Sequence, residues 1–250
     1  MTEFFIISSN KKNGKGKKYD ESGRLLFEGE YKEDIEWDGK KYIYNDDGQL
    51  IKEYTIINRD KVYAKVYNDD GDLIIDAEYY LKQIWGTRKE YFEGRLIFEG
   101  EYSEKKRKGK GKEFDYYTGK IIFEGEYNDN KRNGNGKEFN INGKLIFEGE
   151  FKNGIKWNGK GYNENNEIEY EIKDGNGKIK EYINGRLLYE GEYKNGKRDG
   201  KGKEYNIINN SLIYEGEYLE GRRNGKGKEY YDGKLIYEGE FLNGKKYKLE

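Results

Sequence analysis

The side chains that could do chemistry in this chain are carboxylates and amines, because its 250 residues include neither histidine nor cysteine. Their absence removes the commonest general base, thiol nucleophiles and the usual zinc ligands. The 49 Asp and Glu residues recur at fixed spacing along the chain instead of gathering into one pair. We therefore expect no enzymatic activity, no cofactor, no metal site and no small-molecule substrate.

Two stretches imitate ligand-binding motifs. Residues 191–197 (GEYKNGK) have the spacing of a phosphate loop up to its lysine, but Arg198 follows where a Ser or Thr would bind the metal. Residues 68–72 (NDDGD) look like a calcium loop, but Val66 occupies the first ligand position. We interpret both stretches as turns.

One stretch concentrates basic residues, at 104–112 (EKKRKGKGK). It is either a solvated turn or a contact for anionic lipid or an acidic partner, at about 1 kcal/mol per well-placed cation. The cations concerned are Lys105, Lys106, Arg107, Lys108, Lys110 and Lys112.

Three tryptophans precede the second half of their repeats, at Trp37, Trp85 and Trp157. Two readings are open for them. They fill the space inside larger turns, or they form an exposed edge that binds a partner, since aromatic anchors dominate many interfaces.

The charge balance argues against several classes of partner. Lys and Arg number 48 against 49 Asp and Glu, so the net charge is −1 and the chain lacks the basic field of nucleic-acid binders. The N-terminal residues 1–10 have no positive n-region, and no segment approaches 18 apolar residues. We expect a cytoplasmic protein, either free or associated with a membrane or the cytoskeleton.

A short motif recurs along the whole chain and organises it. The pattern is Leu-Ile-(Phe/Tyr)-Glu-Gly-Glu-(Tyr/Phe), and less regular copies are centred on Tyr54, Ala77 and Tyr170. When these copies are included, the pattern returns every 21 to 25 residues. About ten units then account for nearly all residues, which is the signature of a repeat protein. The clear copies are centred on Gly29, Gly100, Gly125, Gly149, Gly191, Gly216 and Gly239.

Each unit contains two short alternating runs separated by turns, which predicts a β-hairpin. Along the first strand, Phe147, Gly149 and Phe151 share one face and Glu148 lies on the other. We expect an aromatic ring of the next hairpin to cover the bare glycine, and the lysines of the second strand to pair with the glutamates across strands. The predicted repeat core is Phe27, Gly29, Tyr31, Phe98, Gly100, Tyr102, Phe123, Gly125, Tyr127, Phe147, Gly149, Phe151, Tyr189, Gly191, Tyr193, Tyr214, Gly216, Tyr218, Tyr237, Gly239 and Phe241.

The predicted turns carry Asn-Gly or Asp-Gly pairs, which favour tight hairpin turns. They are Asn142-Gly143, Asn153-Gly154, Asn184-Gly185, Asn195-Gly196, Asp232-Gly233 and Asn243-Gly244.

The stretch 189–202 (YEGEYKNGKRDGKG), like 123–136, resembles MORN repeats. The resemblance implies an all-β fold: an elongated, single-layer, twisted antiparallel sheet of about ten stacked hairpins, on the order of 95 Å long at roughly 4.8 Å per strand. It covers nearly the whole chain.

Two features depart from the family pattern. The family's His before Gly-x-Gly is replaced, for example by Asp199. The second-strand aromatic, as in Tyr205 and Tyr230, comes three residues after the second glycine instead of two, so without a bulge it lies on the opposite face. Bacterial MORN-like proteins described as antitoxin components share this late aromatic.

We expect one array over 1–250 without separate globular domains. Its parts are an N-terminal cap and first unit at 1–31, degenerate repeats at 32–92, regular repeats at 93–154, a degenerate repeat at 155–182, and regular repeats with a C-terminal cap at 183–250.

The leading functional hypothesis is a non-catalytic scaffold that binds a protein, or a second copy of itself as a homodimer, along an extended aromatic and glycine sheet face. A second hypothesis is a peripheral membrane adaptor that contacts anionic phospholipid through 105–112. A third is a bacterial MORN-like antitoxin module, with 32–92 holding the partner.

Overall fold

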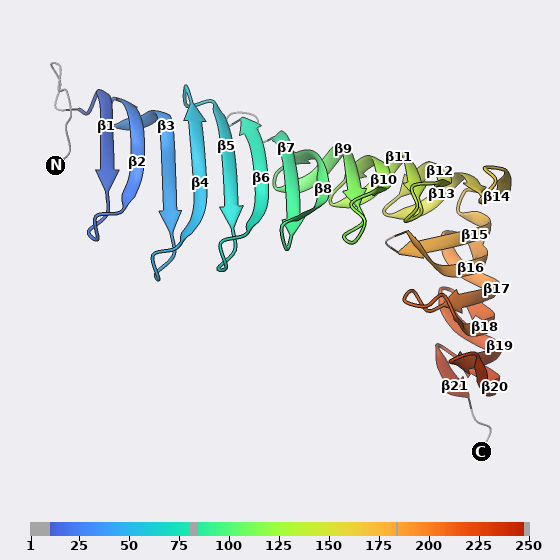
Figure 1. The fold of residues 1–250 in the computed structure, drawn as a ribbon. Helices are drawn as coiled ribbons and strands as arrows, with labels where there is room; N and C mark the ends of the chain where they lie inside the picture. The colour runs from blue at the N-terminus through green and yellow to red at the C-terminus, as the bar shows by residue number, and fades with distance from the viewer. Residues whose placement is uncertain (1–10, 81–84, 184, 248–250) are drawn as a thin grey trace. The chain divides into compact units, whose positions relative to one another are not determined.

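The chain folds as one antiparallel sheet of consecutive hairpins in a computed structural model that describes residues 11–80, 85–183 and 185–247 (Figure 1). Twenty-one strands form in the described residues, and successive strands pair as neighbours, for example β11 with β12 and β12 with β13. The all-β prediction is confirmed. Alternating apolar and charged residues with glycine-containing turns favour this outcome over helix.

The chain divides into two compact units, Met1–Gly109 and Lys110–Glu250. The first unit contains β1 Gly14–Tyr19, β2 Leu25–Lys32, β3 Ile35–Tyr44, β4 Leu50–Ile57, β5 Lys61–Tyr67, β6 Leu73–Tyr80, β7 Trp85–Phe92 and β8 Arg95–Ser103. Strand β9, Lys106–Phe114, contains the division.

The second unit holds most of the regular repeats. Its strands are β10 Ile121–Asn128, β11 Lys131–Phe139, β12 Leu145–Lys152, β13 Ile155–Tyr162, β14 Ile168–Lys173, β15 Asn176–Ile183, β16 Arg186–Lys194, β17 Lys197–Tyr205, β18 Leu212–Leu219, β19 Arg222–Tyr231, β20 Lys234–Leu242 and β21 Lys245–Tyr247.

Four predicted two-residue turns are confirmed by their backbone angles. Both residues have positive φ, as at Asn195 (51°) and Gly196 (76°), which is the conformation that Asn-Gly and Asp-Gly favour. The other three are Asn153-Gly154, Asp232-Gly233 and Asn243-Gly244. The predicted turn at 184–185 lies partly outside the described residues.

The turn that contains Asn142-Gly143 is of a different kind. Here the Asn140 side-chain oxygen accepts hydrogen bonds from the backbone N–H of Asn142 and of Lys144, each at 3.0 Å. The Gly143 N–H donates to the Asn140 carbonyl at 2.8 Å. Asn140 therefore sets a longer turn, because its side chain replaces backbone partners.

A β-bulge follows this longer turn in the regular repeats. Glu138 pairs with Phe147, but Phe139 pairs with Leu145, so Ile146 is an extra residue in β12. The same register shift occurs beside Tyr205 and Tyr230. The bulge lies in the first strand of the following hairpin and leaves the alternation of the second strand unchanged.

The hydrophobic core consists of aromatic rings lying on glycines. A Cβ atom built at Gly125 or Gly136 would lie 2.7 or 2.6 Å from Cζ of Phe123, so the Phe123 ring covers both glycines. The prediction that the covering ring comes from the next hairpin is wrong, because Phe123 belongs to the same strand as Gly125. The next hairpin instead contributes Phe151, which meets Phe123 edge to face at 5.1 Å between centroids.

Most of the predicted core aromatics are buried in the structure. Tyr193 and Tyr237 are the exceptions and are only partly buried. The buried members are Phe27, Tyr31, Phe98, Tyr102, Phe123, Tyr127, Phe147, Phe151, Tyr189, Tyr214, Tyr218 and Phe241. The aromatic face is therefore filled by its own side chains.

Candidate binding groove

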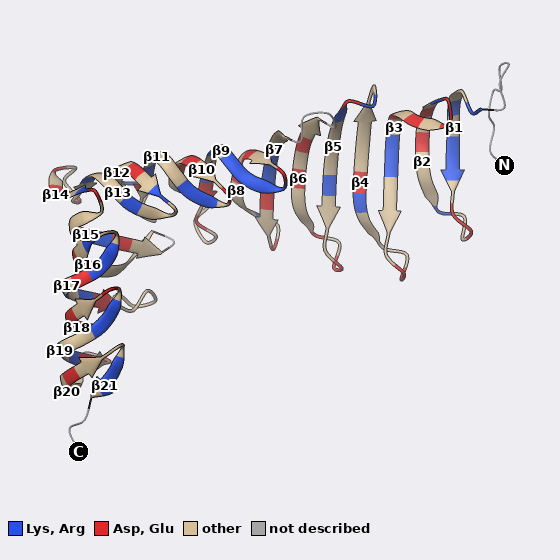
Figure 2. Ribbon diagram, turned by 180° about the vertical axis from the view of Figure 1, so that it is seen from behind, with Lys and Arg blue, Asp and Glu red and all other residues tan. Residues whose placement is uncertain are grey.

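The Glu and Lys residues that flank the repeat glycines lie on the face opposite the aromatic rings. In β16 and β17 the glycine under the ring is flanked by two residues of one sign, in Glu190-Gly191-Glu192 and Lys201-Gly202-Lys203. Neighbours of a glycine point away from the ring that covers it, because side chains alternate along a strand. Acidic and basic bands alternate on successive strands of the regular repeats (Figure 2).

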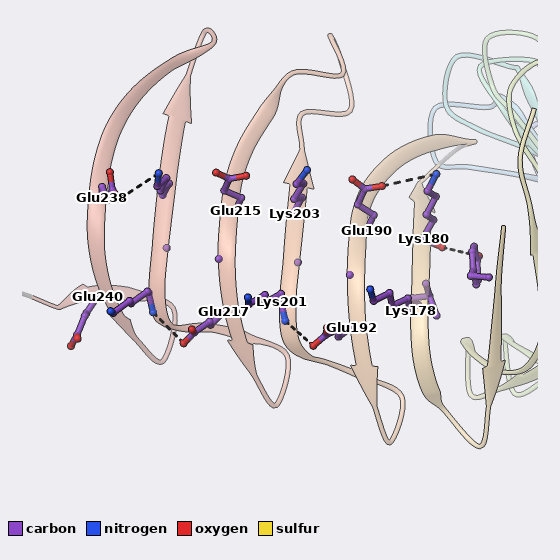
Figure 3. A pocket seen from close by; sticks show the side chains of 18 of the residues that line it. Lys178, Lys180, Glu190, Glu192, Lys201, Lys203, Glu215, Glu217, Glu238 and Glu240 are labelled. Atoms are coloured by element: carbon purple, nitrogen blue, oxygen red, sulfur yellow. Dashed lines mark hydrogen bonds and ion pairs between the residues drawn. The ribbon is translucent and has the colours of Figure 1, made fainter.

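This charged face is hollowed over β14–β20, and we call the hollow the charged groove. It has a volume of about 970 Å³. Figure 3 shows two rows of charged side chains with a bare strip between them. Its lining residues are Glu169, Tyr170, Lys178, Ile179, Lys180, Glu190, Gly191, Glu192, Lys201, Gly202, Lys203, Glu215, Gly216, Glu217, Lys226, Gly227, Lys228, Glu238, Gly239 and Glu240.

The groove has a regular construction, with two rows of alternating charge on either side of a floor that is mostly glycine backbone. The first row is Lys180, Glu190, Lys203, Glu215, Lys228 and Glu238. The second row is Lys178, Glu192, Lys201, Glu217, Lys226 and Glu240. The floor contains Gly191, Gly202, Gly216, Gly227 and Gly239.

Tyrosines and ion pairs hold the first row in place. The Tyr205 hydroxyl donates to Glu190 at 2.5 Å, and the Tyr230 hydroxyl donates to Glu215 at 2.9 Å. Lys228 lies 3.4 Å from Glu238, which confirms the predicted pairing of lysine and glutamate across strands. The two tyrosines lie on the charged face, because the carboxylates they bind are there, so the prediction for the late aromatics is confirmed.

These contacts also affect the tyrosine hydroxyls. Burial, followed by the hydrogen bond to Glu190, raises the pKa of Tyr205 above its ordinary value. For Tyr230, the hydrogen bond to Glu215 is the larger cause of its raised pKa. Both hydroxyls therefore remain protonated donors at neutral pH and keep the two carboxylates oriented.

Backbone hydrogen bonds hold the second row. The Lys201 N–H donates to Glu192 at 3.1 Å, and the Lys226 N–H donates to Glu217 at 3.3 Å. The second row is interrupted in β11, where Asn135 replaces the lysine, whereas β9 carries Lys110 at the equivalent position. From β15 to β20 the charge alternation is uninterrupted in both rows.

Sequence reasoning missed a ladder of paired charges on the aromatic face. Arg198 lies between Glu181 and Glu204, at 2.7 and 2.9 Å, and its guanidinium is 4.2 Å from the Tyr189 ring centroid. The sequence pattern that could have predicted this ladder is an Arg four residues before the second glycine of Gly-x-Gly and a Glu two residues after that glycine, as in Arg198, Gly202 and Glu204. The ladder continues in the order Glu181, Arg198, Glu204, Arg223, Glu229 and Lys246.

The ladder has counterparts in the preceding repeats. In the first unit, Arg107 pairs with Glu90 at 2.6 Å. Burial raises the pKa of Glu90, but hydrogen bonds from Tyr102 and Arg107 outweigh burial and lower it. In the second unit, Lys156 is buried and pairs with Glu138 at 2.7 Å. Burial lowers the pKa of Lys156, and the charge of Glu138 more than reverses this and raises it.

The two motif look-alikes are turns, as predicted. Residues 191–197 run from β16 into β17 through the Asn195-Gly196 turn. In residues 68–72, the Gly71 N–H donates to the Asn68 carbonyl at 3.0 Å. Within the described ranges, no group of three or more His, Cys, Asp or Glu residues is arranged to hold a metal ion.

The three tryptophans lie in different surroundings. Trp157 packs over the turns of the following hairpins, because a Cβ atom on Gly175 would lie 2.7 Å from its indole ring. Trp37 is partly buried, with the Lys32 amine 4.2 Å from its ring centroid. Trp85 is 47% exposed and lies 5.4 Å from the Tyr80 ring. Trp157 thus packs against turns of the following hairpins, and both readings of the tryptophans stay predictions.

The residues of the basic run have different surroundings. Arg107 lies over the Phe98 ring at 3.8 Å on the aromatic face of the first unit. In the second unit, Lys112 pairs with Glu124 at 3.6 Å. Lys105, Lys106, Lys108 and Lys110 are exposed. Lipid contact through this run also stays a prediction.

A sheet of stacked hairpins with a filled aromatic face and a regularly charged opposite face defines the chain as a β-hairpin repeat protein. The family model for the MORN repeat matches residues 98–115, 123–144, 147–161, 189–206, 214–234 and 237–246. The chain is therefore a MORN repeat protein, with the matched repeats within residues 98–246.

Other comparisons add nothing on function. No curated protein matches the chain. The crystal structure of TcdB2-TccC3-TEV aligns with 12% identity and a TM-score of 0.23 over 92% of this chain and 12% of that one. That of TcdB2-TccC3 aligns with 12% identity and a TM-score of 0.25 over 92% of this chain and 17% of that one. At such scores the likeness carries no argument.

The described part of the chain contains no helix that is both long and apolar enough to cross a bilayer.

Proposed function

We propose that this chain is a non-catalytic scaffold that binds a segment of another protein in the charged groove. The observation that supports the proposal is the groove itself, with two ordered rows of alternating charge above a glycine floor. The aromatic side chains are mostly buried on the other face, so the binding surface differs from the aromatic face expected from sequence. The membrane and antitoxin hypotheses stay predictions.

The partner lies across the strands and does not extend the sheet within the groove. Strands β15–β20 each pair with a strand on both edges, so their backbone groups are already used. Recognition must therefore come from side chains, and strand addition is excluded inside the groove.

The alternating rows act over short distances. Opposite charges on neighbouring strands are roughly 4.8 Å apart and cancel each other's field a few ångströms above the surface. The field of such a surface does not attract a distant partner. A partner that touches the surface meets alternating acidic and basic side chains. The groove therefore selects partners by the register of their charges more than by their net charge.

Selection from a library of random twelve-residue peptides displayed on phage tests the proposal. We expect peptides enriched on the full chain to lose binding to a Lys203→Glu, Lys228→Glu double variant, which breaks the alternation of the first row. The matched control is Lys194→Glu, Lys197→Glu, which makes the same charge change at an exposed hairpin end outside the groove. Enrichment of no peptide, or equal binding to the groove variant, overturns the proposal.

A further inference from the structure

The charged groove has a fixed spatial period, and this deepens the proposed function on which the inference rests. Its strands are about 4.8 Å apart, and each row changes sign from one strand to the next, so like charges recur at about 9.6 Å. In the first row this places Glu190, Glu215 and Glu238 at equal intervals. A bound segment must present its charges with the same repeat.

Three regular conformations can be compared with this period. An extended β segment directs side chains to one row every second residue, at about 6.6 Å. An α-helix returns to the same face after seven residues, at about 10.5 Å, and so drifts by about 2 Å in two repeats. A polyproline II helix has three residues per turn and a repeat of about 9.3 Å, so it drifts by less than 1 Å over the same length.

The groove also suits the backbone of polyproline II. This helix makes no internal backbone hydrogen bonds and needs none from a sheet. The groove floor offers none, because its strands are paired on both edges. The strip of backbone between the two charged rows carries no side chain on this face, so a chain lying along the strip meets both rows (Figure 3).

The two rows together determine the order of charges in the segment. Both rows have the same sign on a given strand, as with Glu215 and Glu217, and the next strand carries Lys226 and Lys228. In polyproline II each residue lies about 3.1 Å beyond the one before it, whereas neighbouring strands are about 4.8 Å apart. If one residue lies above a given strand, the residue that follows it is therefore closer to the next strand than to the strand below its predecessor. A basic residue that meets a glutamate of one row is then followed by an acidic residue that meets a lysine of the other.

We propose that the charged groove binds a polyproline II segment with basic and acidic residues at adjacent positions, repeated every three residues. The groove from β15 to β20 spans five strand spacings, about 24 Å, which corresponds to about eight residues of this helix. The third position of each repeat faces solvent and suits proline.

Three synthetic nonapeptides with the same numbers of lysine and glutamate test the inference. The first is three copies of Lys-Glu-Pro, the second is its scramble KKEEPKPEP, and the third, KETKETKET, keeps the order and three-residue period of the charges but replaces proline by threonine. Binding to the full chain is measured by isothermal titration calorimetry. We expect the first peptide to bind about tenfold more tightly than the scramble, with the threonine peptide between them.

Two protein variants complete the test. Binding of the Lys-Glu-Pro peptide is expected to fall to that of the scramble in Lys203→Glu, Lys228→Glu and to be unchanged in Lys194→Glu, Lys197→Glu. Equal binding of the periodic and scrambled peptides overturns the inference, as does equal binding to both variants. If phage selection still yields groove-dependent peptides, the inference fails alone; if it yields none, the proposed function fails with it.

Discussion

At the scale of single residues, the arginine of each regular repeat makes two kinds of contact at once. Arg198 places its guanidinium over the Tyr189 ring and between two carboxylates. Paired charges of this kind contribute little net stability, but removing one partner leaves the others uncompensated in a desolvated place. The ladder therefore makes the aromatic face intolerant of single neutral substitutions.

Arg198→Met is expected to lower the free energy of unfolding by about 3 kcal/mol, because Glu181 loses its cation and Glu204 keeps only Arg223. Chemical denaturation followed by circular dichroism measures the change. Lys197→Met, one residue away and exposed, is the matched control and should leave stability nearly unchanged. A loss of similar size in both variants would show that the ion pairs are not responsible.

The buried tyrosines make the free energy of unfolding depend on pH in the alkaline range. Burial, as the largest cause, raises the pKa of Tyr214 to about 12 from about 10 in the unfolded chain. The folded state therefore favours the neutral phenol, and this contribution is fully present below pH 10 and is lost as pH rises through about 12.

Tyr214→Phe should reduce the loss of stability between pH 10 and 12, since one buried ionisable group is removed. Phenylalanine already occupies the equivalent place at Phe123, so the neutral-pH stability should change by less than about 1 kcal/mol. Unfolding free energies at pH 8 and pH 11 measure the effect, with the exposed Tyr231→Phe as control. An unchanged difference between the two pH values would contradict the prediction.

At the scale of the element, regular hairpins such as β16–β17 and β18–β19 are held by a ring that lies over two facing glycines. A Cβ atom at Gly202 would lie 2.2 Å from the Tyr189 hydroxyl oxygen and 2.5 Å from ring carbons. The ring is itself enclosed by Tyr218 and Arg198, so it cannot move aside without disturbing both. The glycines are required by the close approach of the ring.

Gly202→Ala is expected to destabilise the chain by about 1–3 kcal/mol through overpacking. If the Tyr189 ring is the obstacle, combining Gly202→Ala with Tyr189→Leu should cost less than the sum of the two single changes. A double-mutant cycle of unfolding free energies measures the coupling. Strict additivity would show that the alanine is harmful for another reason.

At the scale of the whole molecule, the repeats are interchangeable because each hairpin contacts mainly its neighbours. The edge-to-face contact between Tyr189 and Tyr218 is equivalent to that between Tyr214 and Phe241, at 5.2 and 5.1 Å. Removing one repeat can therefore recreate an existing interface from the two flanking hairpins.

Deletion of residues 192–216 joins Gly191 to Glu217 and should give a folded chain with a similar β signal per residue and a lower unfolding midpoint. The shortened groove should also bind the Lys-Glu-Pro nonapeptide more weakly, because two of its strands are lost. Circular dichroism and calorimetry measure both. A deletion of 192–210, which breaks the repeat register, is the control, and equal folding of the two deletions would contradict equivalence of repeats.

Much of the fold follows from local pattern alone. Alternating residues, Asn-Gly turns and a repeat near 24 residues predict stacked hairpins, since each unit contains its own turn chemistry and aromatic pair. Local pattern did not show which hairpin supplies the ring above a glycine, because that depends on how far Phe123 reaches across to Gly136. It also missed the ladder, because Arg198 and Glu181 are 17 residues apart.

The sequence by itself determined the family, the hairpins and the two chemically distinct faces, because each depends on residue types at short spacing. The tertiary structure decided which face is open. The aromatic face is filled because the glycines let its rings lie flat beneath the arginines. The same alternation places the Glu and Lys rows on the other side, where the strip of backbone between the rows is the floor of the groove.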